Sequence, residues 1–143
     1  MTELDDFLGS IVPRHMAADK ALHSGDPAGR IAMWSTNEPV TLFGAWISGT
    51  GSPAATAVFQ RLGETFSDCV SFDFEVVAAG VSGDLAYTVA YEHTTASIYG
   101  APAEPYTLRV THVYRREDGE WQVVHRHGDP IPSGSIGETA EPG

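Results

Sequence analysis

Two histidines near the end of the chain are the first residues whose spacing could support chemistry. They lie in the segment V-V-H-R-H-G-D-P, residues 123–130, where one residue separates His125 from His127. In a β-strand, residues two apart point to the same face, so both imidazoles would share a face and Arg126 would take the other. Such a pair can bind a metal ion, exchange protons with a ligand, or line a pocket with polar groups.

The elements that must position these histidines change type along the chain. Apolar residues recur with helical spacing over residues 4–22, where Pro13 would kink or divide the helix, and again over 55–66. From residue 70 onward the period falls to two, and turn signals separate predicted strands over 70–76, 85–95, 106–115 and 121–127. Helices followed by an antiparallel meander predict an α+β fold, with helices laid on one face of a curved sheet that closes around a cavity. We expect one domain over residues 1–131 and a disordered tail over 132–143, which has nothing to pack.

Composition narrows the classes of partner. Eight basic and nineteen acidic residues give a net charge of −11, which repels phosphate backbones and anionic lipids, so we expect no nucleic-acid or membrane partner. The first residues carry acids where a signal peptide needs positive charge, so we expect a cytoplasmic location. The single Cys69 excludes an internal disulfide and a multi-cysteine metal site. No motif places a third ligand beside the two histidines, and we expect neither a metal nor another cofactor.

One segment carries a family resemblance. The run L-R-V-T-H-V-Y-R-R-E-D-G-E-W-Q-V-V-H-R-H-G-D-P, residues 108–130, resembles the last hairpin of SnoaL-like proteins. These belong to the nuclear-transport-factor-2-like superfamily, which also includes ketosteroid isomerase. The hairpin is especially similar to that of the association domain of calcium/calmodulin-dependent protein kinase II. The segments A-L-H-S-G-D and P-V-T-L-F-G-A-W, residues 21–26 and 39–46, fit the same family.

The resemblance covers about residues 17–130 and implies a cone-shaped α+β fold, a pocket between sheet and helices, and commonly a homodimer joined through sheet faces. The kinase domain carries several arginines in its cavity. Here Val89 and Gly128 stand at two of the matching places, and Arg109 lies two residues from the nearest one. A multi-arginine carboxylate site is therefore not implied intact.

Strand pairing predicts which side chains face the cavity. A three-residue turn in the last hairpin sets Arg115 opposite Trp121 and Arg109 opposite His127. Trp121 and Val123 suit a cavity floor, so we assign their face to the cavity, with Glu92, His112 and Arg126 on the outer face. The inward residues would then be Arg109, Thr111, Val113, His125 and His127, joined by Tyr87, Val89, Tyr91 and His93 from the neighbouring strand.

These placements lead to two functional hypotheses. The first is a pocket that binds a small carbonyl- or carboxylate-bearing compound and catalyses isomerase-, cyclase- or hydratase-type proton transfer. Its expected catalytic residues are His127, His125, Arg109 and Tyr91, and its expected ligand-binding residues are Trp34, Phe43, Trp46, Phe59, Tyr87, His93 and Thr111. The second is a non-catalytic association or ligand-sensing module that acts through sheet-face oligomerisation. In either case we expect a homodimer.

Overall fold

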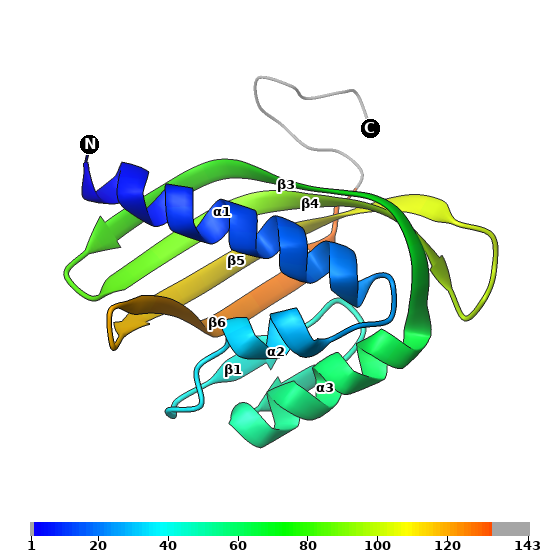
Figure 1. Ribbon diagram of the computed structural model, residues 1–143, viewed down its shortest axis with the longest axis horizontal. Coiled ribbons are helices and arrows are strands. Elements are labelled where there is room, and N and C mark those ends of the chain that lie inside the picture. The colour runs from blue at the N-terminus through cyan, green and yellow to red at the C-terminus, as the bar shows by residue number, and fades with distance from the viewer. Residues whose placement is uncertain (1, 133–143) are drawn as a thin grey trace.

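The computed structural model describes residues 2–132, so the predicted tail lies outside the described residues apart from residue 132. The elements in chain order are α1 (Glu3–Leu22), α2 (Ala28–Met33), β1 (Thr41–Phe43), β2 (Ser48–Thr50), α3 (Ser52–Thr65), β3 (Phe66–Ser82), β4 (Leu85–Ile98), β5 (Glu104–Glu117) and β6 (Glu120–Pro130). The strands form one sheet in the order β2-β1-β6-β5-β4-β3. Figure 1 shows the three helices together on the concave face of this curved sheet. The predicted α+β fold is confirmed.

Packing on the sheet explains why α1 is a single helix. Thr2 and Asp5 form a reciprocal capping box at its start, and the helix continues through Pro13, which the sequence suggested would kink or divide it. Phe7 and Ile11 are buried before the proline, and Leu22 is buried after it. This apolar face lies along the sheet and holds both halves in line, and packing of such a face stabilises helices more than local propensity does.

The core lies between the helices and the concave face. Phe7 meets Tyr114 and Trp121 edge-on, with ring centroids 5.0 and 5.2 Å apart. Phe59 of α3 packs against Trp34 at 5.0 Å, and Val123 is fully buried on β6.

No helix among residues 2–132 is long and apolar enough to cross a membrane.

The last hairpin differs from its predicted pairing in two ways. Its turn has two residues, Asp118 and Gly119, both with positive φ, so Arg116 rather than Arg115 lies opposite Trp121. A β-bulge then interrupts the ladder, because Tyr114 pairs with Val123 but the preceding Val113 pairs with His125.

The turn and the bulge together reverse most of the predicted face assignment. Trp121 and Val123 are buried in the core as predicted, but the extra residue at Val124 shifts the alternation beyond it. Arg126 therefore turns inward beside His112, whereas His125 and His127 turn to the outer face. On β5 and β4 the inward set is Leu108, Val110, His112, Tyr114, Thr88, Ala90, Glu92 and Thr94, which corrects the predicted set.

Candidate functional site

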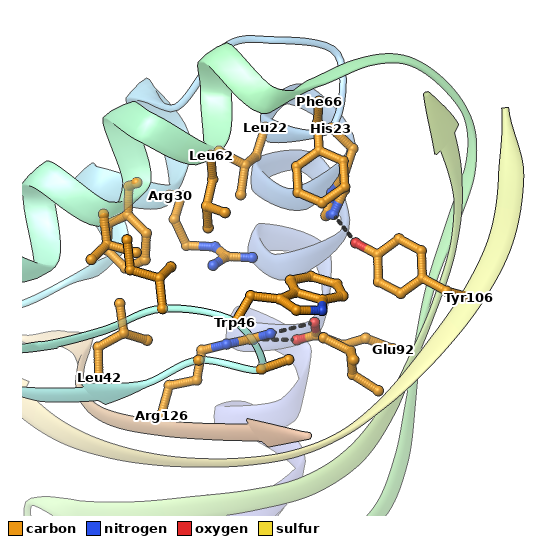
Figure 2. A pocket seen from close by; sticks show the side chains of 16 residues that line it. Leu22, His23, Arg30, Leu42, Trp46, Leu62, Phe66, Glu92, Tyr106 and Arg126 are labelled. Atoms are coloured by element: carbon orange, nitrogen blue, oxygen red, sulfur yellow. Dashed lines mark hydrogen bonds and ion pairs between the residues drawn. The ribbon is translucent and has the colours of Figure 1, made fainter. Parts of the chain in front are cut away.

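A cavity opens between the helices and the concave face, near the end of α1. It is narrow, with a volume of about 40 Å³. Its walls are mostly apolar and come from α1, α3, β5 and the loop between β1 and β2. The polar groups that line it are His23, Arg30, Glu92, Tyr106 and Arg126. Figure 2 shows these five polar side chains among apolar ones such as Leu22 and Leu62.

A buried ion pair forms one wall of the cavity. The guanidinium of Arg126 donates to both carboxylate oxygens of Glu92, at 2.7 and 2.9 Å. Burial would raise the pKa of Glu92, but the charge and hydrogen bonds of Arg126 overcome this and lower that pKa. Arg126 also donates to Nε2 of His112 at 3.3 Å. The ion pair lowers the pKa of Glu92 and raises that of Arg126, so both members are charged at neutral pH.

A second buried pair lies on the helical side. The carboxylate of Asp19 on α1 contacts the guanidinium of Arg30 on α2, and both side chains are almost fully buried. Burial lowers the pKa of Arg30 to about 9, and the nearby Arg126 acts in the same direction, yet the guanidinium remains charged at neutral pH. The guanidinium of Arg30 also stacks over the ring of Phe59, 5.3 Å from its centroid. The two ion pairs together carry no net charge.

Behind these pairs lies a layer of neutral buried histidines. Nε2 of His15 lies 2.8 Å from the hydroxyl of Tyr114, which lies 2.7 Å from the hydroxyl of Thr88. Burial lowers the pKa of His15 to about 3 and places that of His112 well below its ordinary value. Both imidazoles are therefore neutral at pH 7. They pack against each other, with ring centroids 4.5 Å apart, and His112 contacts Arg126 of the cavity wall.

The cavity also holds a hydrogen-bonded histidine–tyrosine pair whose proton positions can be deduced. His23, at the end of α1, places Nδ1 2.6 Å from the backbone oxygen of Asp19 and Nε2 2.7 Å from the hydroxyl of Tyr106 on β5 (Figure 2). A carbonyl oxygen can only accept, so Nδ1 carries the proton and Nε2 accepts from the tyrosine O–H. Burial lowers the pKa of His23 to about 4 and raises that of Tyr106 to about 12. At neutral pH the pair is an uncharged base joined to an uncharged acid.

Trp46 stands at the opening of the cavity. It lies in the tight turn between β1 and β2, where Gly44 N donates to Ile47 O at 3.1 Å. A Cβ on Gly44 would collide with that oxygen, so the turn requires glycine. The indole meets the ring of Tyr106 edge-on at 5.6 Å, although 61% of Trp46 remains exposed.

The structure places the four predicted catalytic residues outside this cavity. Arg109 lies on the outer face and forms two hydrogen bonds to Asp129, both 2.8 Å long. His125 and His127 lie on the same face, and each meets the ring of Phe43 edge-on, with ring centroids 5.6 and 5.8 Å from it. Tyr91 pairs with Arg109 across β4 and β5 and shares that outer face.

Two of the seven predicted ligand-binding residues, Trp46 and Phe59, line the cavity. Trp34 packs behind Phe59 in the core. The remaining four lie on the outer face, where His93, for example, contacts Glu75 at 2.8 Å; these four are Phe43, Tyr87, His93 and Thr111.

Sequence reasoning missed the polar residues that do line the cavity. Glu92 and Arg126 were assigned to the outer face, and the bulge that turns Arg126 inward has no clear signal such as a glycine or proline at Val124. His23 gave a usable signal, because it lies at the end of a predicted helix directly before the Ser24-Gly25 stop. A histidine there points past the helix end toward whatever the sheet places opposite, which is Tyr106.

Comparison with known proteins agrees with the observed fold. The sequence model of the SnoaL-like domain matches residues 17–132. A candidate dehydratase of the NTF2-like family from Streptomyces avermitilis is 18% identical, with a TM-score of 0.71 over 90% of this chain and 98% of that one. A candidate calcium/calmodulin-dependent protein kinase type II association domain from Thiobacillus denitrificans is also 18% identical, with a TM-score of 0.64 over 90% and 92%.

An NTF2-like superfamily protein from Salmonella enterica is 17% identical, with a TM-score of 0.63 over 93% of this chain and 92% of that one. A search of curated proteins finds no match. At these identities the likeness to solved structures concerns the fold alone.

Proposed function

The chain belongs to the SnoaL-like family, and from that premise we propose that it binds a small neutral carbonyl compound in its cavity and transfers a proton beside the carbonyl. The observation that carries this proposal is the hydrogen-bonded pair of His23 and Tyr106, an uncharged base and an uncharged acid in one apolar site. Isomerisation and dehydration are the reaction types that such a pair supports.

The proposed chemistry uses both members of the pair. When a ligand carbonyl approaches, the Tyr106 O–H turns from Nε2 of His23 to the carbonyl oxygen, and the Nε2 lone pair becomes free. Nε2 then takes a proton from the carbon beside the carbonyl, and the electrons of that C–H bond form an enolate whose oxygen Tyr106 holds. In a β,γ-unsaturated ketone, return of this proton from the imidazolium to the γ-carbon completes an isomerisation. In a β-hydroxy ketone, the enolate expels the β-hydroxyl group, which takes the proton of the imidazolium and leaves as water, and this completes a dehydration.

Electrostatics support a role for His23 as the proton acceptor. Burial is the largest effect and lowers the pKa of His23, so Nε2 is unprotonated and able to accept a proton at neutral pH; the carboxylate of Glu92 acts in the opposite direction and offsets part of the cost of forming the imidazolium. The imidazolium and the enolate also neutralise each other, so the reaction creates no net charge in the cavity.

The charges of the cavity favour a neutral ligand over a carboxylate. The guanidinium of Arg126 is already held by Glu92, and that of Arg30 by Asp19. A ligand carboxylate would have to break one of these pairs or add an unpaired charge to a buried site, which is costly. The net charge of −11 disfavours anions further.

A matched pair of ligands tests the proposal. 2-Pentanone and butanoate have nearly the same shape, and NMR titration should give tighter binding for the neutral ketone. Tyr106→Phe should weaken ketone binding by roughly tenfold, the value of one lost hydrogen bond. Tyr91→Phe is the control, because Tyr91 lies on the outer face of the same sheet. Tighter binding of butanoate, or a loss in Tyr91→Phe alone, would contradict the proposal.

The outer sheet face supports a second proposal, that two copies of the chain associate through it. Four large apolar side chains are exposed there, Phe43, Leu85, Tyr87 and Val89. Large apolar side chains exposed on one face of a protein often mark an interaction surface, and these four suit such a contact. Association through this face would leave the cavity open, so self-association and ligand binding are compatible.

A further inference from the structure

Exposed aromatic side chains gather at one other place, a groove outside the opening of the cavity. Trp46 is 61% exposed there and Tyr99 79%. The groove lies between the end of α3 and the loop that joins β4 to β5. It is much larger than the cavity, with a volume of about 400 Å³.

The groove and the cavity share a wall. Trp46, Ile47, Leu62 and Phe66 line both spaces. The Trp46 indole lies 5.6 Å from the ring of Tyr106, so the boundary between the spaces passes beside the proposed proton donor. A ligand whose carbonyl reaches the Tyr106 hydroxyl therefore has its remaining atoms directed past Trp46 toward the groove.

The far wall of the groove is held in a fixed position. Tyr99 has a φ of 51°, in the left-handed region that a bulky aromatic residue rarely adopts. Its N–H donates to the backbone oxygen of Thr65 at 2.8 Å, which ties the loop to the end of α3. This tie places Tyr99 and the neighbouring Ile98 opposite Trp46 before any ligand arrives.

Size and polarity together identify the occupant. The cavity supplies polar groups but little room, and the groove supplies room with mainly apolar walls. We propose, on the basis of the function proposed above, that the groove binds the apolar tail of the ligand whose carbonyl enters the cavity. The substrate class is thus a ketone or aldehyde with an alkyl or aryl tail several carbons long.

A series of 2-alkanones from 2-butanone to 2-decanone tests this subsite by isothermal titration calorimetry. Each methylene that reaches the groove should tighten binding by roughly fourfold, the effect of burying one CH₂. Thr65→Trp should fill the groove and Ile98→Ser should remove part of its wall, so both variants should flatten the dependence on chain length. Val70→Ser is the control, because it replaces another exposed aliphatic side chain, on β3, that lies outside the groove. Circular dichroism checks that each variant is folded.

The outcomes separate the two proposals. If 2-butanone binds and needs Tyr106 but longer ketones bind no better, the tail subsite is refuted and the proposed function stands. If affinity rises with length equally in wild type, Thr65→Trp and Ile98→Ser, the tail lies elsewhere and the subsite is again refuted. If no ketone binds, the proposed function fails and the subsite fails with it.

Discussion

Acidification from pH 7 to pH 5 should remove a large part of the stability of this fold, because three buried histidines stay neutral in it. These are His15, His23 and His112. Burial lowers the pKa of His15 to about 3 and of His23 to about 4, and lowers that of His112 well below its ordinary value. In the unfolded chain each imidazole titrates near the ordinary histidine pKa of 6.5, so the unfolded state binds more protons as the pH falls below that value.

The magnitude follows from this difference. At pH 5, about 1.5 pH units below the unfolded pKa, each histidine that must stay neutral lowers the free energy of unfolding by about 2 kcal/mol. The three together lower it by up to about 6 kcal/mol, against a total of about 5–15 kcal/mol for a typical domain. Carboxylates whose pKa the fold lowers, such as Glu92, lose their contribution only below about pH 4.5, so this pH window isolates the histidines.

Urea unfolding followed by circular dichroism at pH 7 and pH 5 measures the effect. His15→Gln should reduce the difference between the two pH values by about 2 kcal/mol, whereas His127→Gln, on the exposed outer face, should leave it unchanged. A free energy of unfolding that is the same at both pH values would refute the reasoning, because it would mean that the buried imidazoles become protonated without cost.

Two further predictions concern the ion pair and the outer face. Glu92→Ala should lower the free energy of unfolding by about 3–5 kcal/mol, because it leaves the guanidinium of Arg126 buried without a counter-charge. In urea unfolding, the double variant Glu92→Leu, Arg126→Met should recover much of that loss. A double variant as unstable as Glu92→Ala would contradict this. Val89→Glu should turn the proposed dimer into a monomer in sedimentation velocity, since a carboxylate would enter the proposed apolar contact. An unchanged sedimentation coefficient would exclude this face.

The sequence predicted the fold well because periodicity and turn signals act over short distances. The helical spacing of residues 4–22 and the change to a period of two after residue 70 both appear in the structure. The inward-facing residues could not be predicted as well, because they depend on strand register. One residue fewer in the turn at Asp118 and one bulged residue near Val124 were enough to reverse the faces of β5 and of the part of β6 beyond Val124.

The polar residues of the cavity could not be predicted for the same reason. Glu92 and Arg126 read as outer-face residues because charged side chains in a strand usually face water. They are buried here because each is the partner of the other across β4, β5 and β6, and such a pairing is visible only once the register is known. His23 was missed as well, although its position at a helix end is a local feature that the sequence shows.

The most direct test of the central claim is whether the protein catalyses exchange of the protons beside a ketone carbonyl. In D₂O, ¹H NMR follows the loss of the α-proton signals of 2-pentanone. We predict that the wild-type protein accelerates this loss, that His23→Gln slows it by roughly 100-fold or more, and that His127→Gln leaves it unchanged. Exchange that persists in His23→Gln, or that is lost in His127→Gln instead, would contradict the assignment of the base to His23 and of the chemistry to the cavity.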